Sequence, residues 1–442
     1  MKKLLSVALA FLMLAVMLPV TAMAEENYVM ISGITGVENE KYASFEAAYN
    51  AIKLKLEALC KSDALGQGGT TAEEFDALFF NRDENGNATL TYTISGNITY
   101  DESTLNNLLT FGRRASHYGN DRHLLNFKFI GATGRDSDTL TVKSNITLPY
   151  EWWGEKTTTS ISFENLTITG TAPNGLYPTQ AYFDGINFKV NNCKLEGIKI
   201  YNCSNVGGSY TITNNIFDGT NAPQNAYAIH LQGNETAPLT INISNNTIFG
   251  YDRGINIDQK TAAATISNNN ISVKDAGRSC IQLTQLASTK VENNTMKLTG
   301  GNAITLHEEL LNCAKPEITV SGNAINGSGY LIYDDSNGAF TNENLNLTIT
   351  KDNTVAKTVD TTKGVKDGEI YPLSEIVKTT VENNVVPGGS TGGTIVIITP
   401  TEDTPKTEPE KNPATGANDV VAAAVALMAV SALGAAVLTR KK

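Results

Sequence analysis

A repeated six-residue motif constrains the fold of this chain more than any other feature. The motif reads aliphatic, polar, Asn, Asn, any residue, aliphatic. Clear copies begin at Ile243, Ile266, Val291 and Val381, and looser copies begin at Phe163, Val190, Ile212 and Val320. A second motif follows the copies in the middle of the chain. It reads small residue, aliphatic, polar, aliphatic. Its first aliphatic residues are Ile198, Ile229, Ile255, Ile281 and Ile304, at intervals of 31, 26, 26 and 23 residues.

This period of 20 to 30 residues predicts a solenoid of short strands. One coil cannot bury its own apolar face, so neighbouring coils must stack, at about 4.8 Å per coil. We therefore predict an all-β parallel β-helix over residues 91–385. The paired asparagines fall at the turn after the first strand. There the first asparagine can adopt a left-handed backbone and the second can hydrogen-bond along the helix axis. Asn246 and Asn269 are therefore expected to be buried in turns.

The repeat resembles that of the right-handed parallel β-helix proteins of the pectin-lyase-like superfamily. Residues 25–90 precede it, and Phe45, Tyr49, Ile52 and Leu56 recur there at helical spacing. Together with Tyr42 and Leu59 they predict an amphipathic helix that resembles the capping helix of such proteins. Such a cap would cover the open apolar end of the first coil.

The N-terminal end of the chain has the pattern of a secretory signal. Lys2 and Lys3 precede an apolar run, and Ala22 and Ala24 form an A-x-A site, so we expect cleavage of residues 1–24. An uncleaved N-terminal membrane anchor is the alternative.

The C-terminal end resembles a cell-wall sorting signal. The sequence Asn412-Pro413-Ala414-Thr415-Gly416 precedes an apolar run over 420–438 and a basic terminus. This order resembles the L-P-x-T-G signal of Gram-positive surface proteins, with asparagine in place of leucine. The resemblance implies that residues 412–442 are the signal, with a transient membrane span. It also implies that a sortase cuts after Thr415 and links it to peptidoglycan. A plain transmembrane anchor is the alternative.

The segment before this signal is rich in Gly, Thr, Pro and Glu and predicts an extended spacer over residues 386–411. An apolar run at 394–398 interrupts it and is a candidate for docking on the last coil. Without the two terminal segments, 29 basic residues remain against 44 acidic ones. That net charge of −15 does not favour nucleic acid, and a polyanionic ligand would need a local basic patch.

Five cysteines without regular spacing predict no zinc site, and we expect neither a metal nor another cofactor. Cys193 and Cys203 lie close enough in sequence to pair across a tight turn. Burial as small apolar side chains is the alternative for most of the cysteines.

Outward-facing residues of the second motif predict a polar surface suited to sugar hydroxyls. One expected row is Lys199, His230, Asn256, Gln282 and Thr305, and the next is Tyr201, Gln232, Asp258, Thr284, His307 and Asp334. From these rows we select His230, Asn256, Asp258, Gln282 and His307 as candidate glycan-binding residues. An ordinary solvated face is the alternative, because half of every strand faces water.

The only tryptophans, Trp152 and Trp153, are further candidates for glycan binding, because aromatic rings can stack on sugar rings. A hydrophobic plug over the coil is their alternative role.

No catalytic constellation emerges from the sequence. A hydrolase needs two carboxylates within about 10 Å, whereas Asp258 and Asp334 are expected about three coils, or roughly 14 Å, apart. A β-eliminating lyase needs a base and a cation that neutralises a uronate. His230 or His307 would be the base, and Arg253 and Arg278 would be the cations, unless Asp252 pairs with Arg253. The sequence favours a wall-anchored module that binds a glycan or a host surface. A polysaccharide lyase or hydrolase is the alternative.

Overall fold

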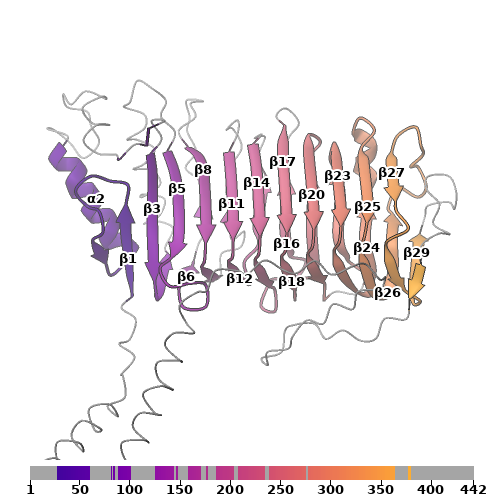
Figure 1. Cartoon of the computed structure of the whole chain (residues 1–442), viewed down its shortest axis with the longest axis horizontal. Helices are drawn as coiled ribbons and strands as arrows, with labels where there is room; N and C mark the ends of the chain where they lie inside the picture. The colour runs from indigo at the N-terminus through magenta and orange to yellow at the C-terminus, as the bar shows by residue number, and fades with distance from the viewer. Residues whose placement is uncertain are drawn as a thin grey trace, which may run out of the picture. The chain divides into compact units, whose positions relative to one another are not determined.

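The chain folds into a right-handed parallel β-helix, as the repeat predicts. The computed structural model describes residues 27–59, 81, 83–84, 88–100, 125–143, 146–147, 158–170, 176–177, 186–203, 208–233, 238–274, 277–363 and 377–379. Each coil adds strands in parallel to the previous coil, so the strands follow one another in a row (Figure 1). No helix within these ranges is long and apolar enough to span a membrane.

Three strand-bearing faces surround the core, and we number them by the order of their strands within a coil. The first face consists of β3 (Ala88–Ser95), β5 (Leu125–Gly131), β8 (Thr158–Glu164), β11 (Ile186–Asn191), β14 (Gly208–Thr213), β17 (Leu239–Ser244), β20 (Ala262–Ser267), β23 (Ser288–Glu292), β25 (Glu317–Ser321) and β27 (Asn346–Ile349).

The second face consists of β4 (Asn97–Tyr100), β6 (Thr139–Val142), β9 (Thr167–Gly170), β12 (Lys194–Glu196), β15 (Ile216–Asp218), β18 (Thr247–Phe249), β21 (Asn270–Ser272), β28 (Thr354–Ala356) and β30 (Val377–Thr379). The third face consists of β7 (Ile146–Thr147), β10 (Leu176–Tyr177), β13 (Ile200–Cys203), β16 (Tyr227–Gln232), β19 (Arg253–Asp258), β22 (Ser279–Gln285) and β29 (Val359–Lys363). Two long strands, β24 (Thr295–Leu306) and β26 (Ala324–Asp334), run through the second and third faces.

The core is built from rows of apolar side chains in register between coils. On the first face, Ile212, Ile243, Ile266, Val291 and Val320 occupy equivalent positions and are fully buried. Toward the N-terminal end the row becomes aromatic, and the rings of Phe129 and Phe163 stack with centroids 4.9 Å apart. The aliphatic positions of the repeat are therefore the inward positions of the strands.

The N-terminal end of the solenoid is covered by a helix, as expected. The helix α2 (Phe45–Leu59) starts after Ser44, whose Oγ accepts a hydrogen bond from the Ala47 amide at 3.1 Å. Phe45 and Ile52 are buried, and the Phe45 ring packs edge-on against Tyr92 of the first face. Tyr42, expected on the helix, lies instead in β2 (Lys41–Tyr42), which pairs with β1 (Tyr28–Ser32).

The paired asparagines of the repeat take two different roles at the turn between the first and second faces. The first of each pair has a left-handed backbone, with φ of 57° at Asn245, 55° at Asn268 and 56° at Asn293. The second is buried and joins a continuous ladder made of Asn215, Asn246, Asn269, Asn294, Asn323 and Asn353. Both expectations for Asn246 and Asn269 are confirmed, since each is 1% exposed.

One step of this ladder shows why asparagine is needed. Asn269 Nδ2 donates to Asn294 Oδ1 at 2.9 Å and to the Ile243 carbonyl at 2.8 Å. Asn269 Oδ1 accepts from the backbone N–H and from Nδ2 of Asn246, at 3.0 and 2.9 Å. One side chain therefore satisfies backbone groups of the preceding coil and joins the amides of three successive coils.

The cysteines that the structure describes are not cross-linked. Cys193, Cys280 and Cys313 form no disulfide bond, so Cys193 does not pair with Cys203. Cys193 and Cys280 are fully buried, and burial raises the pKa of each thiol to about 12. These two residues act as small apolar side chains, which was the alternative.

Candidate glycan-binding face

The third face carries an outward row of polar and aromatic residues. Strand pairing places Tyr201, His230, Asn256, Gln282, Thr305 and Tyr333 at equivalent positions of six successive coils. The row expected from sequence is correct from His230 to Thr305 and wrong at its first member. Tyr201, not Lys199, stands beside His230, because β13 pairs Ile200 with Ile229.

The second outward row is displaced by an irregular pairing. Gln232 pairs with Asp258, and Asp258 then pairs with Gln285 rather than with Thr284. The register shifts between Ile257 and Asp258, a feature typical of a β-bulge. Asp334 pairs with Leu306, so it is not aligned with His307 as the sequence suggested.

A chain of side-chain hydrogen bonds crosses three coils of this face. Arg253 Nη1 donates to the Tyr227 hydroxyl at 2.7 Å, and that hydroxyl donates to Gln282 Oε1 at 3.1 Å. Gln282 Nε2 donates to Thr284 Oγ1 at 3.0 Å, which in turn donates to Asn256 Oδ1 at 2.8 Å. We call these five residues the polar network. It joins β16, β19 and β22 and holds its amides in fixed orientations.

Exposure differs among the members of the polar network. Asn256 points to the outer side of β19 but is only 3% exposed, and Thr284 is 5% exposed. Tyr227, Arg253 and Gln282 are partly exposed. The outer surface of the network is therefore formed by a phenol, a guanidinium and an amide, with Asn256 and Thr284 beneath them.

Aromatic rings gather at the N-terminal side of the polar network. The His230 ring lies 5.1 Å from the Tyr201 ring and 4.9 Å from the Tyr227 ring, centroid to centroid. At the other end of the face, Tyr330 and Tyr333 lie 6.3 Å apart. Sequence reasoning missed Tyr227, Tyr330 and Tyr333 as candidates. Their signal is an aromatic residue on the outer side of a third-face strand, and Tyr227 directly precedes a copy of the second motif.

The environment of His230 keeps its imidazole neutral. Burial, together with the nearby charges of Lys199 and Arg253, lowers the pKa of His230 to about 4. His230 Nε2 is buried and has no hydrogen-bond partner among the residues that the structure describes. This histidine can therefore accept or donate a hydrogen bond at neutral pH without carrying charge.

Asp258 and His307 lie near one another at the far edge of the face. Burial, together with the nearby charge of Glu309, raises the pKa of Asp258 to about 6, although His307 acts in the opposite direction. His307 caps the short 3₁₀ helix η1 (Glu308–Asn312), because its Nδ1 accepts a hydrogen bond from the Glu309 amide at 3.3 Å. Its Nε2 lies 3.8 Å from Asp335. His307 thus has a structural task, and Asp258 is protonated in part near pH 6.

The two arginines proposed as cations for a lyase differ in position. Arg253 opens β19, whereas Arg278 lies in the turn before β22 and donates to Asn225 Oδ1 at 3.3 Å. Asp252 does not neutralise Arg253 but forms an ion pair with Lys274 at 3.4 Å. Arg253 therefore belongs to the face, and Arg278 belongs to its border.

The carboxylate pair of a hydrolase is not formed by Asp258 and Asp334. They lie three coils apart, and Asp334 is 4% exposed. Its oxygens accept from the amides of Ser336 and Gly338, so this side chain closes a turn. Trp152, Trp153 and the sorting-signal residues 412–416 fall outside the described residues, as does the docking segment 394–398. They stay predictions.

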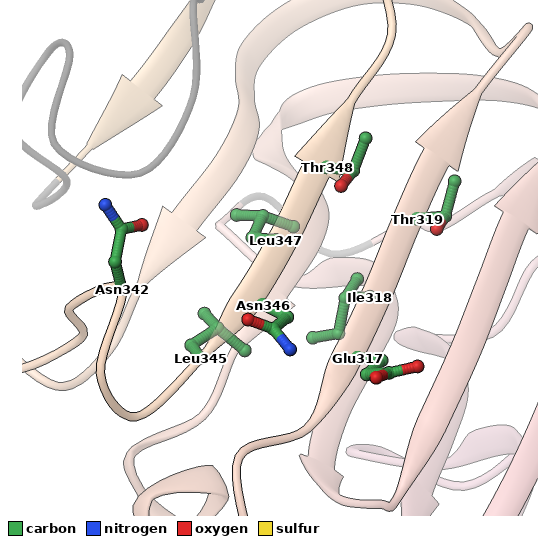
Figure 2. Close-up of a pocket in the computed structure, with 8 residues that line it drawn as sticks. All are labelled: Glu317, Ile318, Thr319, Asn342, Leu345, Asn346, Leu347 and Thr348. Carbon is green, nitrogen blue, oxygen red and sulfur yellow. The ribbon is translucent and has the colours of Figure 1, made fainter.

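Two shallow hollows lie away from this face. One, of about 380 Å³, lies over β25 and β27; Figure 2 shows Thr319 and Thr348 projecting from adjacent strands, with Asn342 on the loop beside them. The other, of about 390 Å³, lies near Glu196 and Asp218 of the second face. Neither of these two hollows is lined by a residue of the polar network.

Comparison with protein families gives a match to the middle of the chain. Residues 164–363 are similar to the NosD family, described as "Periplasmic copper-binding protein (NosD)". The match covers 200 of the 442 residues and includes the polar network and the outward row from Tyr201 to Tyr333. NosD is a β-helix family, in agreement with the observed fold. No curated protein and no solved structure matches the chain.

Proposed function

We propose that this is an extracellular surface protein whose third face binds glycans. The observation that supports this proposal is the combination of partly exposed aromatic rings with amides that the polar network holds in place. Sugar rings stack on aromatic faces, and sugar hydroxyls exchange hydrogen bonds with amides. Because the β-helix holds these groups in place, little side-chain freedom is lost on binding. The similarity to a periplasmic family supports a location outside the cytoplasm.

The test of this proposal is a glycan panel probed with the secreted protein and two variants. Tyr227→Ala removes a ring and the centre of the polar network, and we expect it to weaken binding about tenfold or more. Thr211→Ala, on the outer side of β14 in the first face, is the matched control and should bind like the parent. Absence of any glycan ligand would refute the function. Full binding by Tyr227→Ala would place the site elsewhere, with Trp152 and Trp153 as the next candidates.

We further propose that the protein is attached to the cell wall through Thr415 by a sortase. The order of the pentapeptide at 412–416, the apolar run and the basic terminus supports this proposal. Deletion of residues 412–442 should release the protein into the medium. Extraction of the intact protein by detergent alone, without digestion of the wall, would contradict covalent attachment.

A β-eliminating polysaccharide lyase is the second candidate function, favoured by one observation. The ring of a neutral His230 lies 4.9 Å from the Tyr227 ring, centroid to centroid, and Arg253 donates to the Tyr227 hydroxyl at 2.7 Å. In such a reaction a base removes the proton next to a uronate carboxylate. The neighbouring C–O bond then breaks, and an acid protonates the leaving oxygen. Appearance of unsaturated-uronate absorbance with a polyuronate would establish this activity, and its absence would leave the binding function alone.

Copper binding, named in the description of the similar family, does not fit the residues described here. Copper prefers imidazole and sulfur ligands. No group of three or more His, Cys, Asp or Glu side chains with metal-ligand geometry occurs in the described ranges. His230 and His307 are three coils apart, and Cys193 and Cys280 are buried in the core. We therefore assign no metal to this part of the chain.

A further inference from the structure

Two cations on the candidate face lack an acidic partner, although the protein carries a net charge of −11. Lys128 and Lys189 of the first face both pair with Glu164, at 3.2 and 3.1 Å. By contrast, Lys199 and Arg253 form no ion pair with any residue in the described part of the chain. Burial lowers the pKa of Lys199, so this ammonium is partly removed from water. Removing a cation from water without a counter-charge costs free energy. Two such cations close together in an acidic protein indicate a site for an external anion.

The guanidinium of Arg253 is held in place, but not all of its N–H groups have hydrogen-bond acceptors. Nη1 donates to the Tyr227 hydroxyl, and the guanidinium carbon lies 4.9 Å from the centroid of the Tyr227 ring. Nε is buried without a hydrogen-bond partner in the described ranges. Because a guanidinium carries five N–H donors, most of its donor capacity remains unused. Arginine in a fixed orientation is well suited to bind a planar or tetrahedral anion.

Positive charge and aromatic surface meet at one place on the face. Lys199 Nζ lies 5.1 Å from the centroid of the Tyr201 ring, and the His230 ring lies between those of Tyr201 and Tyr227 in the network of ring contacts. Both cations also act on His230, whose pKa they lower together with burial. The charge of Lys199 and that of Arg253 therefore converge on the aromatic cluster.

We propose that Lys199, Arg253 and the rings of Tyr201, Tyr227 and His230 form a subsite for an anionic sugar. The sugar ring stacks on the aromatic cluster, and its carboxylate or sulfate group pairs with the two cations. This inference rests on the proposed glycan-binding function and specifies the ligand class within it. The rest of the glycan extends over the polar network toward Thr305 and Tyr333.

Arg278 supplies a matched control for the charge change. It lies on the coil next to that of Arg253, but its guanidinium contacts Asn225 at the border of the face. Replacing either arginine by glutamine removes one positive charge from the same region of the protein. Only the Arg253 change removes a group of the proposed subsite.

The experiment measures affinity for matched pairs of polysaccharides that differ in charge alone. One pair is polygalacturonate and its methyl ester, and the other is a sulfated galactan and its desulfated form. We expect the full-length protein to bind at least one anionic member about tenfold or more tightly than its neutral partner. Comparison of the two pairs distinguishes a carboxylate from a sulfate ligand. Lys199→Gln and Arg253→Gln should each abolish the preference, and Arg278→Gln should retain it.

The outcomes separate the subsite from the function on which it rests. Equal binding of charged and neutral members overturns the anionic subsite and leaves glycan binding intact. A charge preference that survives in Lys199→Gln and Arg253→Gln, or is lost equally in Arg278→Gln, also overturns the subsite. Failure to bind every polysaccharide on the wider glycan panel overturns both. Unchanged melting temperatures of the three variants establish that each result concerns binding rather than folding.

Discussion

Replacing Asn269 by leucine should destabilise the β-helix strongly, because leucine has the same number of side-chain heavy atoms but no hydrogen-bonding groups. The change removes the acceptor of the Asn246 backbone N–H and of one Asn246 side-chain N–H. It also removes the donor to the Ile243 carbonyl. Asn294 Oδ1 loses one donor as well but keeps the Asn269 backbone N–H. For the other three groups, at about 1 kcal/mol or more for each, the loss of unfolding free energy is about 3 kcal/mol or more.

Urea denaturation followed by circular dichroism measures this effect. The control is Asn242→Leu, the same chemical change at an exposed position of β17. Asn268→Gly is a second control, since glycine adopts the left-handed backbone at φ 55° without strain and should cost little. An Asn269→Leu midpoint equal to that of Asn242→Leu would refute the assigned role of the ladder.

Three further predictions concern charge and backbone. Because Asp258 binds its proton more tightly in the folded state, the free energy of unfolding should fall as pH rises from about 4 to about 6. The Asp258→Asn variant should lack that part of the decline. Identical stability–pH profiles of the parent and the variant would contradict the raised pKa. The His230 imidazole should show no NMR titration between pH 5 and 8, whereas a midpoint near 6.5 would show that it is solvated. Gly322 has φ of 63°, and an added Cβ would lie 2.3 Å from Asn293 Oδ1; Gly322→Val should therefore lower the urea midpoint, and an unchanged midpoint would contradict the strain.

The asparagine pairs could be predicted from sequence because each role depends on local chemistry. A left-handed backbone position favours Asn or Gly wherever it occurs. Gly322 indeed occupies the position that Asn293 occupies on the preceding coil. The inward aliphatic positions followed from alternation alone. These signals repeat in every coil, so an error at one copy is corrected by the next.

The candidate face was predicted less completely, for two physical reasons. Alternation gives the outward positions of a single strand, but the register between coils depends on the turns. The irregularity after Ile257 therefore shifted the partner of Asp258 from Thr284 to Gln285. The reach of a long side chain also exceeds one coil, so Tyr227 of β16 contacts Gln282 of β22, two coils away. The sequence pattern alone does not predict a contact between side chains two coils apart.

The hydrogen bonds of the asparagine ladder all run in one direction, so one coil can be added or removed as a whole. Each side-chain amide from Asn215 to Asn323 donates to its C-terminal neighbour in the ladder, and each from Asn246 to Asn353 accepts from its N-terminal neighbour. A coil that carries this asparagine presents the same donor on one side and the same acceptor on the other. Duplication or loss of a whole coil therefore restores the hydrogen bonds at the junction, so such proteins can change length without a new core. Each coil added between Tyr201 and Tyr333 would move these residues about 4.8 Å farther apart and lengthen the glycan that fits between them.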